Sequence, residues 1–263
     1  MDIWAACKEE VTLSAIEGEA IRIVESQEQV ATSSLVDGLA EQSLLEEMLE
    51  RSKPPLPAGT EGLHYLLATP FRYPPLPYGS RFGRRLEPGL FYASQKLATA
   101  LAEAAYYRFV FWSGMEEAPP SSRFLTQHTV FAVNYSTATG LQLQRLPFAA
   151  YETLLTDPTD YVITQQLGGV MRAEGVSAFE YVSARDSNKG TNVALYTPET
   201  FKGKQPLYQQ SWLCETRPDR LSSPSRTTCI NSAWIPTWLT ACFLNRRFEQ
   251  FSGNANSSPL IMK

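Results

Sequence analysis

The sequence is poor in the residues on which metal, redox and disulfide proteins depend. Its 263 residues include two histidines and four cysteines, and no two cysteines form a CxxC pair. A histidine-based zinc site and a disulfide framework are therefore not expected, and the cysteines indicate reduced thiols in a cytoplasmic protein. The longest apolar runs, such as Phe109 to Trp112, are far shorter than a membrane span, so no membrane association is expected.

Three common nucleotide-binding and catalytic motifs are also missing. Gly79, Gly83 and Gly89 do not form a GxGxxG fingerprint between a strand and a helix. Gly203-Lys204 lacks the upstream glycine of a phosphate-binding loop, and Gln205 stands where serine or threonine should follow the lysine. There is no Gly-x-Ser-x-Gly segment either. The sequence thus argues against Rossmann, P-loop and α/β-hydrolase chemistry.

Charge is unevenly distributed along the chain. The net charge is −4, but residues 1–53 alone hold twelve acidic and four basic residues, which leaves the remainder at +4. A mildly basic body suits a small anionic ligand better than nucleic acid, which would require a much more basic surface. We therefore expect no direct binding of nucleic acid.

The acidic segment, residues 1–53, is predicted to form a helical N-terminal extension. Apolar residues recur at helical spacing between residues 34 and 51: Leu35, Val36, Leu39, Leu45, Met48 and Leu49. This stripe is expected to dock on the body of the protein, and the alternative is a surface for a partner protein. The proline-rich residues 53–57 form a stiff linker, so residues 58–216 are predicted to be the main domain and 217–263 a tail of uncertain role.

The body combines short strands and helices without regular βαβ alternation, which predicts an α+β fold. Strands are predicted at residues 128–135 and 140–145, joined as a hairpin, and at 179–184 and 192–196. Helices are predicted at residues 147–155 and 161–171.

The most informative stretch begins with two arginines in loops. Arg72 and Arg81 lie among prolines and glycines, which favour turns. The apolar residues 89–93 follow and predict a strand.

A helix is predicted next, capped by Ser94. Its apolar face comprises Leu97, Leu101 and Ala104, and Glu103 lies away from that face. Arginine-bearing loops, a strand and a helix with a carboxylate, in that order, suit a phosphate-containing ligand.

These residues resemble the RES domain, a family of NAD-consuming toxins from bacterial type II toxin–antitoxin pairs. The family's pattern corresponds to Arg72-Tyr73, Ser80-Arg81-Phe82-Gly83, Tyr92, the Ala-Leu-Ala-Glu run Ala100–Glu103, and the Tyr-x-Ser-Ala-Arg run Tyr181–Arg185. Ser80 stands where the pattern usually has glycine. The order and local spacings match from Pro70 to about Phe201.

The resemblance implies a compact domain similar to ADP-ribosyltransferases, with short strands and helices around an NAD cleft, and makes residues 58–216 the catalytic RES domain. It implies a toxin that cleaves the nicotinamide N-glycosidic bond of NAD and arrests growth, as an NAD glycohydrolase or NAD phosphorylase. One alternative is a mono-ADP-ribosyltransferase that modifies a host protein. Another is an inactive interaction module that binds an antitoxin.

NAD is then a substrate, no metal is required, and four residues are expected to bind it. Arg72 and Arg81 would clamp the diphosphate, because a guanidinium donates two parallel hydrogen bonds to phosphate and stays charged. Tyr73 and Tyr92 would stack on the nicotinamide or contact a ribose hydroxyl.

The residues expected to be catalytic are Glu103, Arg72 and Ser183. Glu103 would stabilise the ribosyl cation of the transition state. Ser183 would also bind NAD, by donating to the nicotinamide amide or to a phosphate oxygen. The resemblance further implies a cognate Xre-like antitoxin with a helix-turn-helix, and an oligomeric toxin–antitoxin complex.

Overall fold

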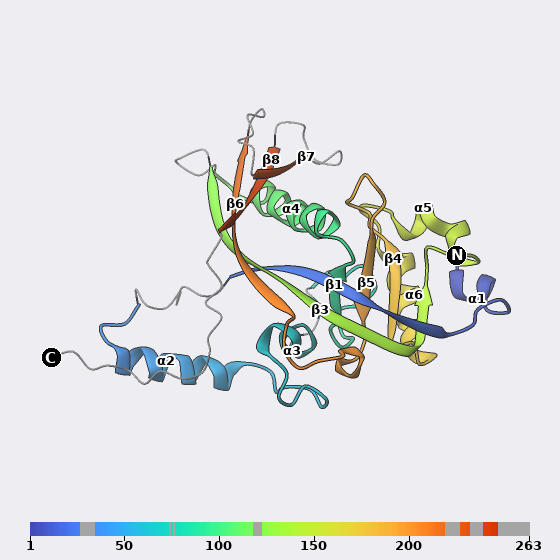
Figure 1. Ribbon diagram of the computed structural model, residues 1–263, viewed down its shortest axis with the longest axis horizontal. Coiled ribbons are helices and arrows are strands. Elements are labelled where there is room, and N and C mark those ends of the chain that lie inside the picture. The colour runs from blue at the N-terminus through green and yellow to red at the C-terminus, as the bar shows by residue number, and fades with distance from the viewer. Residues whose placement is uncertain are drawn as a thin grey trace.

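The computed structural model describes residues 1–26, 35–73, 75, 77–117, 123–218, 227–231 and 239–246, the last two segments by their backbone. The described residues form one eight-stranded sheet in the order β1-β2-β5-β4-β3-β6-β8-β7, with helices packed around it (Figure 1). This arrangement confirms the predicted α+β class. Within the described residues, no helix is long and apolar enough to cross a membrane.

The strands are β1 (Ser14–Glu25), β2 (Phe91–Ser94), β3 (Phe124–Gln142), β4 (Ala178–Val182), β5 (Thr191–Leu195), β6 (Tyr208–Pro218), β7 (Thr227–Asn231) and β8 (Leu239–Arg246). The α-helices are α1 (Ile3–Cys7), α2 (Leu39–Ser52), α3 (Tyr65–Arg72), α4 (Leu97–Ser113), α5 (Glu152–Leu155) and α6 (Val162–Ala173). Short 3₁₀ helices occupy Phe148–Tyr151 and Pro198–Thr200.

Five of the strands close into a ring. β1 pairs with β2 and also with β3, and β2, β5, β4 and β3 follow one another as neighbours. The β1–β3 ladder is long, whereas β1 meets β2 in register only at Ile21 and Ser94. The ring is therefore held weakly at the β1–β2 seam, and β1 beyond Ile21 follows β3 away from β2.

The N-terminal segment differs from its prediction. Helix α2 confirms the predicted helix within residues 1–53, but residues 14–25 form a strand that is part of the five-stranded ring. Ile16 and Ala20 of this strand are buried in the core beside Phe131 and Val133 of β3. The prediction of a helical extension was wrong here, because β1 gains its stability from a partner more than a hundred residues away rather than from local sequence.

The predicted hairpin at 128–145 was also wrong. Residues 124–142 form a single strand, whose first half pairs with β6 and whose end pairs with β4 in parallel. Gly140, the first residue of the predicted second strand, lies inside this single strand, where a side chain would collide with Ile16 of β1. The glycine thus permits close packing of the two strands.

Helix α4 carries the predicted carboxylate and covers the sheet beside β1 (Figure 1). It buries Ala100, Leu101, Ala105, Phe109 and Trp112. Its N-cap is Lys96, which makes no side-chain cap, and Ser94 ends β2 instead, so the predicted capping by Ser94 was wrong.

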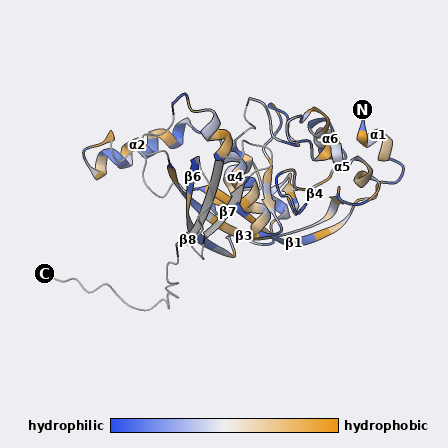
Figure 2. Cartoon of the chain, turned by 90° about the horizontal axis from the view of Figure 1, so that it is seen from above, coloured by the Kyte–Doolittle hydropathy of each residue, from blue (hydrophilic) through white to orange (hydrophobic). Residues whose placement is uncertain are grey.

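Helix α2 extends away from the body in both views (Figures 1 and 2). It buries none of its residues, contrary to the predicted docking of its apolar stripe. Arg72 at the end of α3 ties it to the body through an ion pair with Glu50 of 2.7 Å and a hydrogen bond to the Pro54 carbonyl.

The predicted tail, residues 217–263, lies largely outside the described residues. Within it, β7 and β8 extend the sheet beyond β6.

Candidate active site

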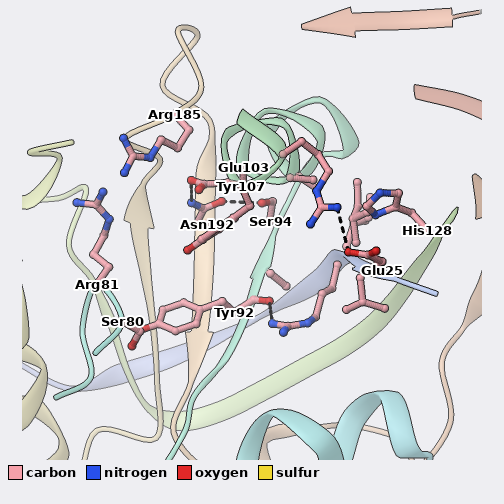
Figure 3. Close-up of a pocket in the computed structure, with 18 of the residues that line it drawn as sticks. Glu25, Ser80, Arg81, Tyr92, Ser94, Glu103, Tyr107, His128, Arg185 and Asn192 are labelled. Atoms are coloured by element: carbon pink, nitrogen blue, oxygen red, sulfur yellow. Dashed lines mark hydrogen bonds and ion pairs between the residues drawn. The ribbon is translucent and has the colours of Figure 1, made fainter. Parts of the chain in front are cut away.

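A cavity of about 410 Å³ lies at the β1–β2 seam (Figure 3). It is lined by residues of β1, β2, α4, β4 and β5 and by the loops that carry Arg81 and Arg185. This volume falls in the range of about 300–1,000 Å³ that is typical of small-molecule sites. The weak closure of the ring therefore leaves room for a ligand.

Glu103 of α4 reaches the middle of this cavity and is held by two hydrogen bonds. Ser183 Oγ and Asn192 Nδ2 each donate to Glu103 Oε1 at 2.6 Å. Ser94 Oγ in turn donates to Asn192 Oδ1 at 2.6 Å. Since Asn192, Ser94 and Ser183 are all buried, these contacts fix the carboxylate from behind.

Two tyrosines complete the surroundings of the carboxylate. Desolvation around its hydroxyl and the nearby charge of Glu103 raise the pKa of Tyr107 to about 12, although the residue as a whole is 60 % exposed. The same two causes raise the pKa of Tyr181 well above its ordinary value. Both phenols therefore stay protonated at neutral pH and can donate hydrogen bonds.

Arg81 and Arg185 lie together on one side of Glu103 (Figure 3). Arg81 stacks on the Tyr161 ring at 4.6 Å and donates to the Asp157 carbonyl at 2.8 Å. Arg185 donates to the Tyr161 hydroxyl at 2.8 Å. Carbonyls and rings orient both guanidinium groups without neutralising them, so both remain available to an anion.

Tyr92 positions the loop that carries Arg81. Its hydroxyl lies 2.9 Å from Ser80 Oγ and accepts a hydrogen bond from the Phe82 amide at 3.1 Å. The side chain lines the cavity, and burial raises its pKa.

Arg22 of β1 also lines the cavity, across the seam from β2. Its Nη1 donates to the Tyr92 carbonyl at 2.5 Å, and its guanidinium lies 5.1 Å from the Phe91 ring. Its Nε is buried without a hydrogen-bond partner, and burial lowers the pKa of Arg22 to about 10. In the part of the chain that the structure describes, Arg22, Arg81 and Arg185 pair with no carboxylate. A desolvated cation of this kind is costly unless an anion binds beside it.

The opposite end of the cavity is closed by an ion pair. Arg108 Nη1 lies 3.0 Å from Glu25 Oε2, and His128 lines the same end. Figure 3 shows Glu25 and His128 on the far side of Glu103 from Arg81 and Arg185. Burial and the charge of Arg108 lower the pKa of His128 to about 4, so this imidazole is neutral at pH 7.

The structure brings together some of the residues expected from the sequence and not others. Glu103, Arg81 and Tyr92 line the cavity, and Ser183 is buried behind Glu103. Arg72 and Tyr73 do not line it. Arg72 faces Glu50 and Pro54 of the α2 segment, and Tyr73 is 40 % exposed.

Sequence reasoning missed Arg22, Asn192 and Arg185. Arg185 ends the Tyr-x-Ser-Ala-Arg run, and a role for it could have been drawn from that motif. A single arginine in the apolar, β-branched run of residues 20–24 was the signal for Arg22, since a charge inside such a strand needs a functional or structural reason. Asn192 carried no local signal. Among the described residues, no group of three or more His, Cys, Asp or Glu could hold a metal ion.

Comparison with known proteins gives three findings. No curated protein matches this chain. One similar solved structure is the crystal structure of the M. tuberculosis MbcT-MbcA toxin-antitoxin complex, with 10% sequence identity, a TM-score of 0.44, and coverage of 75% of this chain and 85% of that chain. The family model of the RES domain matches residues 56–216, which is more than half of the sequence. This chain therefore belongs to the RES domain family.

Proposed function

We propose that this protein is a toxin that degrades NAD by breaking the bond between nicotinamide and ribose, and that a cognate antitoxin neutralises it. Membership of the RES family and the composition of the cavity support the proposal. NAD combines an anionic diphosphate with a ribose that becomes cationic as the bond breaks, so its site must offer both kinds of charge. The residues that line the cavity offer both.

The observation that carries the proposal is one carboxylate held among three arginines without carboxylate partners. Arg22, Arg81 and Arg185 can neutralise two phosphate groups. Glu103 is fixed by Ser183 and Asn192, so its charge needs no reorganisation during the reaction. Arg22 takes the role that the sequence assigned to Arg72.

The chemistry is a heterolytic cleavage at the anomeric carbon. The C1′–N1 bond breaks, its electron pair passes to the ring nitrogen, and the cationic nicotinamide leaves as a neutral molecule. The ribose develops positive charge at C1′, which Glu103 stabilises. An acceptor oxygen then bonds to C1′ and loses its proton. Water, phosphate or a protein side chain would serve in this step.

The role of Ser183 changes in this proposal. Its hydroxyl proton is engaged by Glu103, while its oxygen accepts from the backbone amides of Arg185 and Asp186. We assign it to holding the carboxylate and not to contacting nicotinamide or phosphate.

The test is to incubate purified protein with NAD, with and without phosphate, and to identify the products by mass spectrometry. Nicotinamide should appear, accompanied by ADP-ribose or by its 1-phosphate, according to the acceptor. Labelling of a protein instead would indicate ADP-ribosyl transfer. The variant Glu103→Gln keeps the side-chain shape and should reduce nicotinamide release by about 10²–10³-fold, the typical loss of a transition-state charge contact. Glu174→Gln, at an exposed position after α6, is the matched control. Intact NAD with the unaltered protein would refute the proposal.

A further inference from the structure

The hydrogen bonds behind Glu103 have defined directions. Ser183 Oγ accepts from the amides of Arg185 and Asp186 at 3.0 and 3.1 Å. A hydroxyl has two lone pairs and one proton, so the proton of Ser183 goes to Glu103 Oε1 at 2.6 Å.

The orientation of the Asn192 amide is fixed in the same way. Ser94 donates to its oxygen, and its nitrogen donates to Glu103 Oε1, both at 2.6 Å. The backbone supports this arrangement, because β5 places Asn192 in register with Ser94 of β2 and with Tyr181 of β4. Asn192 is only 2% exposed, so water does not compete for these bonds.

Both donors bind the same carboxylate oxygen. Oε1 of Glu103 accepts the hydrogen bonds from Ser183 and Asn192, and the glutamate itself lines the cavity. Oε2 is thereby left for a ligand. A carboxylate on a helix could otherwise rotate about its last torsion, which has a broad energy profile.

We propose that Asn192 is a positioning residue, anchored by Ser94, that holds Glu103 Oε1 from behind so that Oε2 is presented to the ribose of the substrate. The inference rests on the proposed function and adds to it a residue that contacts neither substrate nor reacting atoms. Its action is through Glu103 alone.

The groups that surround this carboxylate are mostly neutral or cationic. The titratable groups that line the cavity with it are tyrosines and cations on six elements or loops: Tyr107 and Arg108 on α4, Tyr181 on β4, Tyr92 on β2, Arg22 on β1, His128 on β3, and Arg81, Tyr161 and Arg185 in the loops. Two other carboxylates are near and already have partners: Glu25 pairs with Arg108 at the far end of the cavity, and Asp186 accepts a hydrogen bond from Thr99. Neither of them hydrogen-bonds to Glu103, so a carboxylate at position 192 creates a new titrating pair.

The test is Asn192→Asp, which preserves shape and replaces the donor by a carboxylate. Two carboxylates at hydrogen-bond distance disfavour each other's ionised forms, so the pair takes up its first proton at a higher pH than a single carboxylate would. The acid limb of the pH profile of kcat should therefore move up by at least ~1 pH unit, and kcat should partly recover as the pH is raised. KM should change little. Asn134→Asp makes the same change on β3, away from the cavity, and should leave the profile unmoved.

A second pair of variants covers the case in which Asn192→Asp does not fold. Ser94→Ala removes the anchor of the amide and should lower kcat by about fivefold, the equivalent of one neutral hydrogen bond. Ser94→Thr retains the hydroxyl, so its kcat should equal that of the wild-type protein.

An active wild-type protein whose acid limb is unchanged by Asn192→Asp, or whose kcat is unchanged by Ser94→Ala, would overturn the role of Asn192 alone. A wild-type protein that leaves NAD intact would overturn the proposed function and this role with it.

Discussion

Replacing Arg22 by methionine should make the protein more stable and less active. Burial lowers the pKa of this guanidinium to about 10, although arginine normally titrates above 12. Each tenfold change in a protonation equilibrium corresponds to ~1.4 kcal/mol, so the folded state bears a cost of at most ~3.5 kcal/mol for this charge. At pH 7 the group is protonated in both the folded and the unfolded chain, so the whole cost is present.

Methionine has a similar length and no charge, so Arg22→Met removes that cost. It also loses the hydrogen bond to the Tyr92 carbonyl, worth ~1 kcal/mol, and the contact with Phe91, worth ~0.5 kcal/mol. The free energy of unfolding should therefore rise by about 1–2 kcal/mol. The value of kcat/KM for NAD should fall by about 10- to 100-fold, since a charged hydrogen bond to phosphate is lost.

Urea denaturation and nicotinamide release measure the two effects on the same preparations. Arg84→Met makes the same substitution at an exposed position before β2 and should change the free energy of unfolding by less than ~0.5 kcal/mol. A variant at Arg22 that unfolds more easily would mean that the guanidinium supports the fold. Full activity of Arg22→Met would mean that the guanidinium of Arg22 does not bind the phosphates of NAD.

Three further predictions concern residues outside the catalytic step. Arg72→Ala should leave NAD cleavage unchanged, because the guanidinium of Arg72 binds Glu50 and the Pro54 carbonyl. Loss of turnover in a normally folded variant would mean that Arg72 takes part in the active site. Tyr135→Phe deprives buried Glu180 of a donor at 2.8 Å and should lower the free energy of unfolding by ~1–3 kcal/mol in urea, with activity retained; equal stability would contradict this. The pKa of His128 is about 4 in the folded protein, against 6.5 in an unfolded chain. Between these two pH values the unfolded chain binds a proton that the folded protein does not, so the free energy of unfolding should fall by up to ~3 kcal/mol as the pH is lowered from 6.5 to 4. His128→Gln should flatten that dependence, and an unchanged slope would assign it to other groups.

What the sequence predicted correctly was local. The helix that bears Glu103 was predicted from apolar residues at helical spacing, and it forms at Leu97–Ser113. Of its predicted apolar face, Leu101 is buried, whereas Leu97 and Ala104 are only partly buried. Arg81 and Tyr92 belong to one short loop and strand, so their proximity follows from the order of the chain. Strands β4 and β5 also lie close to their predicted positions.

What the sequence did not predict depends on long-range pairing. Arg22 reaches the cavity because β1 pairs with β3, and nothing in residues 14–25 identifies that partner. Arg72 fits the Arg-Tyr pattern, but it ends helix α3, which directs its side chain toward Glu50. Asn192 becomes informative only when β5 lies between β2 and β4. These are consequences of tertiary structure, which outweighs local propensity.

The closure of the ring by β1 has a practical consequence for the expression of this protein. Sequence similarity delimits residues 56–216, and a fragment trimmed to those limits would omit β1. Such a fragment would expose the unpaired edge of β3 to other chains, which favours aggregation, and would also lack Arg22 of the cavity. The residues that match the family model are therefore fewer than the residues that form the sheet, because β1 lies before them.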